Sequence, residues 1–152
     1  MLAPVSRRVS ALALSAGLAA ALSSCFVATA VGGAFGADSS CDRRYGASKE
    51  PAPFCQEIED TVAGSEFRED CSTKLQGKAA EEGCPRDKIL GGCRISKEND
   101  DGSVVTDWYY DVRDLVAEGK IPESKRVKSA EEVRALCADR KRYEDGATFV
   151  PP

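Results

Sequence analysis

Apolar residues recur at helical spacing in four stretches of the chain. Residues 55–62 and 67–79 each repeat an apolar residue every three or four positions, and Gly64 lies between them. This spacing predicts a helical hairpin, because residues three and four apart share one face of a helix. Two further helices are predicted at residues 112–118 and 129–143.

Residues at the ends of the two later helices support their boundaries. Gly119 follows the first of them, in a position where glycine commonly ends a helix. Ser129 and Glu132 have the spacing of a capping box, which predicts the start of the last helix. The expected inward stripe of the last helix consists of Val133, Leu136 and Cys137.

Two stretches favour strands. Residues 88–95 are short and compatible with a strand, residues 104–110 are rich in β-branched and aromatic side chains, and residues 98–102 form a polar turn between them. A β-hairpin over about residues 88–110 is therefore predicted. One face of its second strand is expected to carry Val104, Thr106, Trp108 and Tyr110. The expected fold class is α+β, with helices packed on a short antiparallel sheet of two or three strands.

The pattern divides the chain into four parts. Residues 1–24 have the form of a signal peptide. Residues 25–54 are expected to be an anchor and tether, because glycine, proline and charge are scattered over residues 38–54. Residues 55–145 form the predicted cysteine-rich α+β domain, and residues 146–152 a C-terminal tail. No internal repeat is visible in the sequence.

The N-terminal part predicts export. Arg7 and Arg8 precede a run without charge that ends only at Asp38, which is typical of a basic n-region followed by an apolar h-region. The tetrapeptide LSSC that ends at Cys25 resembles the bacterial lipobox. That resemblance implies cleavage before Cys25 and acylation of its thiol by palmitate or a similar chain, with the buried chains holding the protein at a membrane.

Two alternatives follow from the apolar residues after Cys25. The sequence Ala28-Thr29-Ala30 fits an ordinary signal peptidase, which would give a secreted or periplasmic protein. The uncharged run also exceeds the length of about 20 residues that spans a bilayer, so it could stay as a single transmembrane anchor. All three alternatives place the remainder of the chain on the exported side of the bacterial cell envelope.

Charge narrows the range of partners. The 152 residues include 21 basic and 25 acidic side chains, and loss of Arg7 and Arg8 with the leader leaves 19 basic residues, a net charge of about −6. An acidic surface disfavours nucleic acid as a partner. The expected partners are a membrane, reached through the N-terminal lipid or anchor, and an unidentified protein or glycan.

Cysteine usage agrees with export. Setting Cys25 aside leaves an even number of cysteines in a short exported chain, which predicts three disulfides. The six are Cys41, Cys55, Cys71, Cys84, Cys93 and Cys137. Fifteen connectivities are possible. Cys71 on the inward face of a predicted helix and Cys84 just beyond its end suggest one bridge that clips the helix to its exit loop.

The span 55–110 contains two spaced cysteines, then Cys84-Pro85, a glycine-cysteine step at Gly92-Cys93, and a tyrosine-rich strand. In these features it is similar to a group of small exported bacterial proteins, many of them predicted lipoproteins of unknown function. Cys41 and Cys137 lie outside this shared pattern, which suggests a bridge between the ends of the domain. The expected pairs are then Cys71–Cys84, Cys55–Cys93 and Cys41–Cys137.

The sequence lacks the residues of common catalytic and metal sites. It has no histidine and no Cys-x-x-Cys motif, which excludes Ser-His-Asp and Cys-His pairs, imidazole ligands, thioredoxin-like centres and zinc knuckles. The turn at residues 98–102 lacks the ligand spacing of a calcium loop. We therefore expect no metal, no cofactor and no catalytic residue.

One short stretch combines an acid with aromatic side chains. Asp107, Trp108, Tyr109 and Tyr110 are consecutive, and such a combination can form a binding surface for a sugar or protein or, more commonly, the core of a small sheet. The leading hypothesis is a non-enzymatic, lipid-anchored interaction module of the cell envelope. The alternatives are a periplasmic inhibitor of a hydrolase that uses the loop at residues 96–103, and a small carbohydrate-active enzyme that uses carboxylates.

Overall fold

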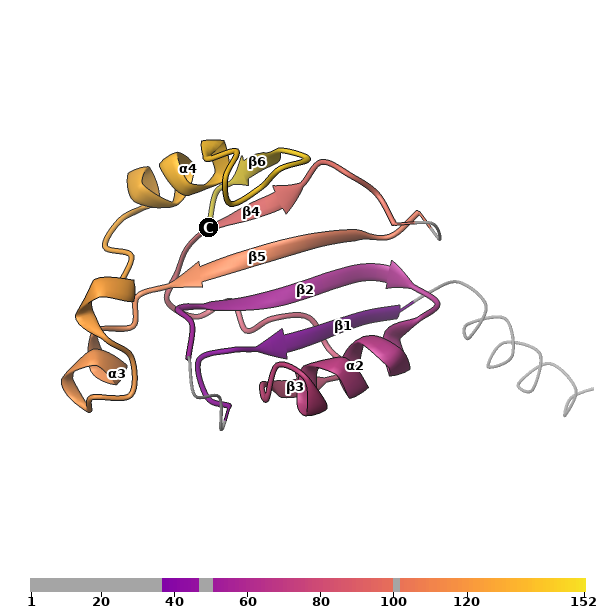
Figure 1. Cartoon of the computed structure of the whole chain (residues 1–152), viewed down its shortest axis with the longest axis horizontal. Coiled ribbons are helices and arrows are strands. Elements are labelled where there is room, and N and C mark those ends of the chain that lie inside the picture. Colours follow the sequence, from indigo (N-terminus) through magenta and orange to yellow (C-terminus); the bar gives the residue numbers. More distant parts are fainter. Residues whose placement is uncertain (1–36, 47–50, 100–101) are drawn as a thin grey trace, which may run out of the picture. The chain divides into compact units, whose positions relative to one another are not determined.

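The chain folds around one antiparallel sheet (Figure 1). A computed structural model describes residues 37–46, 51–99 and 102–152, and this part of the chain contains six strands, three α-helices, a short 3₁₀ turn and three disulfides. The elements are β1 (Ala37–Asp42), β2 (Phe54–Thr61), α2 (Gly64–Thr73), β3 (Lys78–Ala80), β4 (Ile89–Ile95), β5 (Val104–Tyr110), α3 (Arg113–Ala117), η1 (Glu123–Lys125), α4 (Ala130–Ala138) and β6 (Ala147–Val150). The leader and Cys25 lie outside the described residues.

The strand order divides the sheet into two similar halves. The order is β3-β1-β2-β5-β4-β6, and every neighbouring pair is antiparallel. In each half a hairpin is followed by a helix and then by a strand that pairs with the first strand of that hairpin. The chain is therefore a structural repeat of two ββαβ units, although no repeat is visible in the sequence.

The strand register shows that the two halves are related by an approximate two-fold rotation about one residue pair. Cys41 of β1 pairs with Gln56 of β2, and Cys93 of β4 pairs with Asp107 of β5. Gln56 and Asp107 are themselves partners across the central β2–β5 pair. Each half thus maps onto the other about the point where Gln56 meets Asp107.

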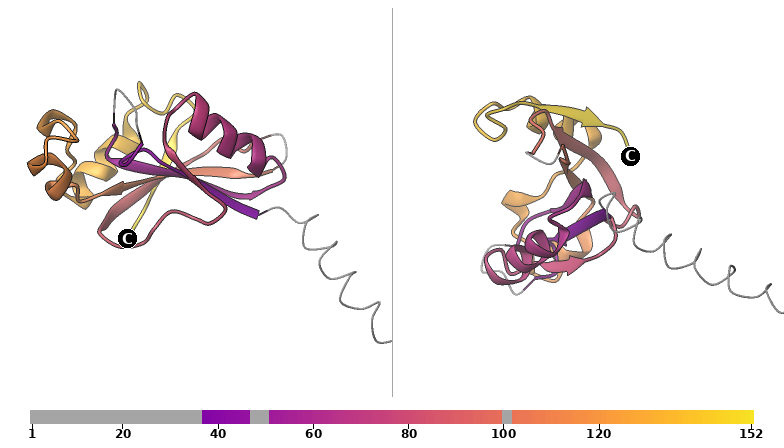
Figure 2. Two further views of the ribbon diagram at one scale, coloured as in Figure 1. Left: turned by 90° about the horizontal axis from the view of Figure 1, so that it is seen from below. Right: turned by 90° about the vertical axis from the view of Figure 1, so that its right-hand side faces the viewer.

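Both long helices cover the same face of the sheet. The Cys41–Cys71 bridge holds α2 against β1, and the Cys93–Cys137 bridge holds α4 against β4. Paired residues project from the same face of a sheet, so Cys41 and Cys93, which share a row with Gln56 and Asp107, point to one side. Figure 2 shows α2 on one side of the sheet and the segment that follows β3 on the other.

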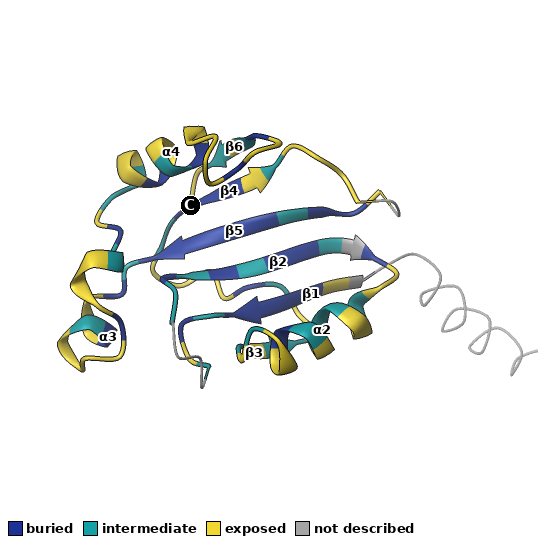
Figure 3. Ribbon diagram, viewed as in Figure 1, coloured by how far each residue is buried: buried dark blue, intermediate teal, exposed yellow. Residues whose placement is uncertain are grey.

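The second face is covered by residues 81–88. The Cys55–Cys84 bridge fastens this segment to β2, and Cys55 projects away from α2 because it is adjacent to Gln56. Two apolar clusters result, one on each face, and Figure 3 shows that β5 between them is largely buried. The buried members are Cys55, Cys84, Trp108, Tyr110, Val112, Leu115 and Ile121 on one side, and Cys93, Tyr109, Val127, Val133, Cys137 and Tyr143 on the other.

Several sequence predictions are confirmed. The hairpin of residues 88–110 is formed by β4 and β5. The predicted helix over residues 67–79 is confirmed only in its first part, because α2 ends at Thr73 and Lys78–Ala80 forms β3. Gly119 follows α3 with a φ of 70°, a backbone conformation that glycine adopts readily. At the start of α4 the Ser129 hydroxyl accepts a hydrogen bond from the Glu132 amide.

The predicted helix at residues 55–62 is wrong, since these residues form β2. Cys55 and Glu57 are buried on one face of the sheet and Ile58 on the other. A central strand covered on both faces need not alternate between apolar and polar residues. The apolar residues of this stretch therefore recur every three or four positions, which is also the spacing expected of a helix.

The predicted sheet was too small and the predicted domain too short. The sheet has six strands rather than two or three, because β1 lies in the expected tether, β6 in the expected tail, and β2 and β3 in stretches predicted as helical. The strands β1 and β6 are short and have little apolar alternation. They are held by pairing with strands that are distant in the sequence, which no local pattern reports.

All three predicted disulfide pairs are wrong, although the predicted use of the six cysteines in disulfides is confirmed. Cys71 and Cys84 lie on opposite faces of the sheet. Cys55 and Cys93 also point to opposite faces, from strands that β5 separates, and two strands separate Cys41 from β4. Disulfides need Cα atoms within about 7 Å. The strand order determines which cysteines come that close.

Candidate functional site

The expected aromatic binding surface is instead part of the core. Asp107, Trp108, Tyr109 and Tyr110 are all buried. Trp108 and Tyr110 contribute to one apolar cluster, whereas Tyr109 contributes to the other, because successive side chains of a strand point to opposite faces. The four residues therefore form no exposed patch.

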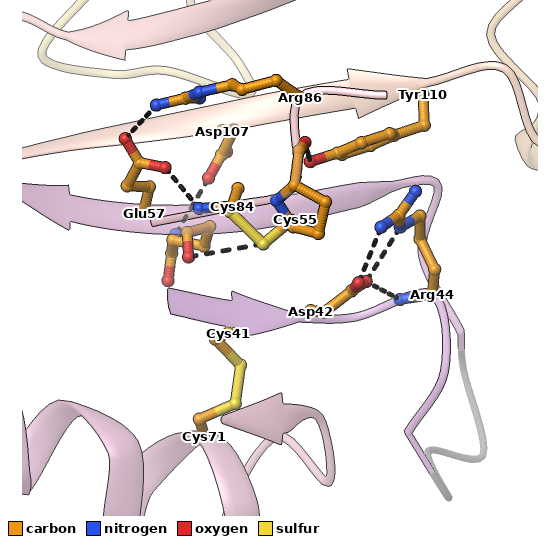
Figure 4. Close-up of a disulfide and its surroundings, with 12 residues drawn as sticks. Cys41, Asp42, Arg44, Cys55, Glu57, Cys71, Cys84, Arg86, Asp107 and Tyr110 are labelled. Atoms are coloured by element: carbon orange, nitrogen blue, oxygen red, sulfur yellow. Dashed lines mark hydrogen bonds and ion pairs between the residues drawn. A yellow bond between two sulfur atoms is a disulfide. The ribbon is translucent and has the colours of Figure 1, made fainter. Parts of the chain in front are cut away.

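Polar groups beneath residues 81–88 form a closed network (Figure 4). Buried Glu57 accepts a hydrogen bond from the Cys84 amide and pairs with Arg86 at 2.7 Å. Nearby, the Arg44 guanidinium forms two hydrogen bonds with the Asp42 carboxylate and lies 3.5 Å from the Tyr110 ring centroid.

The Tyr110 hydroxyl is part of the same network. It donates to the Pro85 carbonyl oxygen, and burial raises the pKa of Tyr110 to about 12. Since the charged groups of this region are paired with one another, we assign the network a structural role.

The sheet face that carries α4 has a hollow of about 620 Å³. Its floor is Phe54 at the start of β2 and Tyr109 near the end of β5, whose ring centroids lie 5.5 Å apart. Leu136 of α4 contributes to one wall, and residues 124–127 around η1 contribute to another. We call this site the Phe54 hollow.

Four cationic side chains border the Phe54 hollow. They are Arg43, Lys125, Arg126 and Arg142. The guanidinium carbons of Arg43 and Arg142 each lie 5.8 Å from the Phe54 ring centroid, and Arg142 also lies 5.5 Å from that of Tyr109. This range permits cation–π attraction. The site therefore combines an aromatic floor with concentrated positive charge.

Neither of the two arginines beside Phe54 forms an ion pair with a carboxylate of the described residues, although the charge of buried Asp107 acts on both. Within this part of the chain, ion pairs engage Arg126 with Glu123 but neither Arg43 nor Arg142. The buried Nε of Arg43 also has no hydrogen-bond acceptor there. Two guanidinium groups that border one hollow and form no ion pair there favour the binding of an anion.

A buried hydrogen-bond chain lies behind the floor. The Tyr143 hydroxyl donates to the Asp107 carboxylate at 2.8 Å and is 2.9 Å from the Tyr109 hydroxyl, and the Gln56 amide donates to Asp107 at 3.0 Å. Burial raises the pKa of Asp107, although these donors and the charges of Arg142 and Arg43 act in the opposite direction. The Asp107 carboxylate, at the point about which the two halves are related, is thus held in a poorly solvated position.

The two acids of the Phe54 hollow are both engaged by backbone amides. The Glu132 carboxylate accepts from the Lys128 amide at 2.8 Å, and the Asp139 carboxylate accepts from the Lys141 amide at 2.9 Å. Both acids come from α4 and its C-terminal end. The Glu132 bond closes the N-terminal end of this helix, and the Asp139 bond lies in the turn that follows it.

A second hollow lies at the other end of the β2–β5 pair. Its floor is Ile58 and Val105, which are paired across the two strands, and Phe67 of α2 contributes to its wall. Its volume of about 570 Å³ is similar to that of the first hollow. Under the two-fold relation it corresponds to the Phe54 hollow, and we call it the Ile58 hollow.

The predicted turn at residues 98–102 is described only at its ends. The Asn99 amide donates to the Ser103 carbonyl oxygen, and residues 100–101 lie outside the described residues. In the part of the chain that the structure describes, no cluster of three or more acidic or cysteine side chains is arranged to hold a metal ion. No helix there has both the length and the apolarity needed to cross a membrane.

Comparison with known proteins adds no assignment. No protein-family model matches the chain, and no curated protein or solved structure shows significant similarity to it. The functional argument therefore depends on the geometry of the site.

The residues of the Phe54 hollow were not singled out by the sequence. Arg43 and Phe54 fell in the expected tether, and Arg142 followed the apolar stripe of the last predicted helix. Arg43 and Phe54 face each other across the β1–β2 connection, and Arg142 comes from a segment distant in the sequence, so no local motif connects the three. Among the predicted surface residues, only Tyr109 borders the hollow.

Proposed function

We propose that the protein is an exported, lipid-anchored and non-enzymatic binding module that takes its ligand in the Phe54 hollow. The observation that carries the proposal is this hollow, with its aromatic floor and two arginines that form no ion pair among the described residues. Its volume falls in the range of about 300–1,000 Å³ that is common for small-ligand sites.

Rigid support of the hollow favours binding. The Cys93–Cys137 bridge fixes α4 to β4, and the central strands provide the floor. Side chains held by a disulfide and a sheet lose little further freedom when a ligand arrives. A partner protein or glycan could present such a ligand as a protruding side chain, chain end or substituent.

The two alternative functions have less support. A glycosidase needs two carboxylates that flank the scissile bond, whereas Glu132 and Asp139 lie on the same wall and accept backbone hydrogen bonds. A hydrolase inhibitor would use the loop at residues 96–103, of which residues 100–101 lie outside the described residues. We therefore place binding before catalysis and inhibition.

Membrane attachment through Cys25 is the second part of the proposal. Mass spectrometry of the mature N-terminus should find an acylated Cys25, and Cys25→Ser should move the protein from the membrane fraction to the soluble fraction. An unmodified N-terminus at Val31, or an intact Met1, would contradict lipid attachment. Either result would leave the ligand site to be tested by itself.

The binding site can be tested without knowledge of the ligand. Amide chemical shifts of the disulfide-bonded full chain would be followed by NMR during titration with a fragment set that contains equal numbers of neutral, cationic and anionic compounds. We expect the largest shifts at residues that border the Phe54 hollow. Hits that cluster at other places, or an absence of saturable shifts, would refute this location.

A further inference from the structure

The charges around Phe54 define the chemistry of a ligand, and this inference depends on the proposed function. We infer that the Phe54 hollow binds an oxyanion, carboxylate or phosphate, that is attached to a flat apolar group. Arg43 and Arg142 hold the oxyanion, and the flat group packs against Phe54 and Leu136.

The positions of the two guanidinium groups carry the first step. Each lies 5.8 Å from the centroid of the same half-buried ring. A guanidinium presents a planar fork of donors that matches a carboxylate or phosphate, which lysine cannot reproduce. Both arginines also border the Phe54 hollow, so an oxyanion bound in it meets the positive charge of each.

The lack of internal neutralisation carries the second step. Among the described residues, several surface cations elsewhere have acidic partners, such as Lys88 with Asp114 and Arg94 with Glu59. Arg43 and Arg142 have none there. Asp107 lies behind the floor, but its oxygens accept from Tyr143 and Gln56. An arriving oxyanion therefore finds donors that no described carboxylate occupies.

The floor carries the third step. The ring of Phe54 and the side chains of Leu136 and Val127 give the hollow an apolar surface next to the cations. A free inorganic anion would leave this surface in contact with water. A ligand with a flat apolar group covers it and gains the free energy of apolar burial in addition to the ionic contact.

The Ile58 hollow provides the contrast. It has a similar volume, but its floor is aliphatic, and Lys97 and Glu98 at its border carry opposite charges. A ligand selected by shape alone would enter both hollows. A ligand selected by charge and ring contact enters only the Phe54 hollow.

Titration of the full chain with four probes tests the inference. The probes are phenylphosphate, phenylacetate, benzyl alcohol as the neutral analogue, and inorganic phosphate as the anion without a ring. We expect both ring anions to bind at least about fivefold more tightly than benzyl alcohol and inorganic phosphate, with shifts at residues around Phe54. Equal binding of benzyl alcohol would overturn the role of charge.

Variants with matched charge changes complete the test. Arg43→Gln and Arg142→Gln should each weaken phenylphosphate about fivefold, whereas Lys97→Gln, which removes one positive charge beside the Ile58 hollow, should change it less than twofold. Arg43→Lys and Arg142→Lys should restore part of the affinity. Each variant must keep the wild-type dispersion of amide signals.

The outcomes separate the two proposals. If fragments bind in the Phe54 hollow but anions have no advantage, or if the arginine variants bind phenylphosphate as well as the wild type does, the inference fails and the proposed site stands. If no fragment binds there, the proposed function fails together with the inference.

Discussion

The two ββαβ halves share a topology and a helix-clamping disulfide, yet only one of them contributes the main walls of a cationic hollow. The difference lies in the connection between the second strand and the helix. In the first half two residues, 62 and 63, join β2 to α2, whereas in the second half residues 111–129 join β5 to α4. The longer connection contains α3 and η1 and supplies one wall of the Phe54 hollow. The two halves thus share a topology, but their strand-to-helix connections differ in length, and the longer one makes the Phe54 hollow distinct.

The halves also differ in how their outer face is closed. The first half has the additional Cys55–Cys84 bridge, and the position equivalent to Cys55 in the second half is Thr106. Beside Thr106, Trp108 fills the corresponding space and the Arg86 guanidinium lies 4.3 Å from its ring centroid. A disulfide in one half is therefore matched by aromatic packing in the other.

The largest expected effect comes from removing the helix clamps. The double changes Cys41→Ala with Cys71→Ala and Cys93→Ala with Cys137→Ala each open a buried bridge, with sequence separations of 30 and 44. Chain entropy predicts a loss of about 4 kcal/mol in the free energy of unfolding for each, measured by guanidinium denaturation.

Ligand binding separates these two double variants. Only loss of the Cys93–Cys137 bridge releases the α4 wall, so phenylphosphate binding should weaken in that variant and persist in the other. The comparison must be made at a temperature where both variants show dispersed amide signals. Equal loss of binding in both folded variants would contradict the separate roles of the two halves.

A smaller effect is expected at the strand position where the halves pack differently. Gly92 pairs with Trp108, and a Cβ atom at Gly92 would lie 2.8 Å from the Trp108 ring. Gly92→Ala should lower the free energy of unfolding by about 1–3 kcal/mol because the ring has to move. Ser40→Ala at the equivalent position of β1 is the control, with a cost of about 1 kcal/mol or less. A Gly92→Ala variant as stable as the wild type would argue against tight packing of Trp108.

The smallest effect concerns pH and the carboxylate at the centre of the two halves. Burial raises the pKa of Asp107, so the folded state binds its proton more tightly than the unfolded state does. This contribution to the free energy of unfolding is complete below the unfolded pKa of about 3.9 and is lost as pH rises through the folded pKa. Relative to the wild type, Asp107→Asn should therefore gain stability as pH increases above 4.

Asp111 provides a control of opposite sign. Its hydrogen bonds with Arg113 lower its pKa, so its contribution is present above the unfolded pKa and is lost as pH falls through the folded pKa. Asp111→Asn should lose stability relative to the wild type as pH increases. Thermal unfolding of the two variants between pH 3 and pH 8 measures both slopes, and slopes of the same sign would refute the raised pKa of Asp107.

Local sequence patterns predicted the elements that have their own start, period or end. The turn between β4 and β5, the Ser129 cap and Gly119 each act within a few residues, and each was recognised. By contrast, β1 is held between β2 and β3, the edge strand β6 is held by β4, and β2 is buried on both faces. For these three strands the physical cause lies outside any local window.

The candidate site was beyond sequence reasoning for the same reason. Arg43, Phe54 and Arg142 become neighbours only when β1, β2 and the segment after α4 meet at one end of the sheet. The disulfide pairs depend on strand order in the same way. By contrast, the use of all six cysteines followed from their even number, which needs no knowledge of the fold.

The central claim is that the Phe54 hollow, and not its counterpart, is the ligand site. Intermolecular nuclear Overhauser effects between the ring protons of phenylphosphate and the disulfide-bonded chain test it most directly. The account predicts contacts to the Phe54 ring and the Leu136 methyl groups and none to Ile58 or Phe67. Contacts to Ile58 and Phe67 of equal or greater intensity would contradict it.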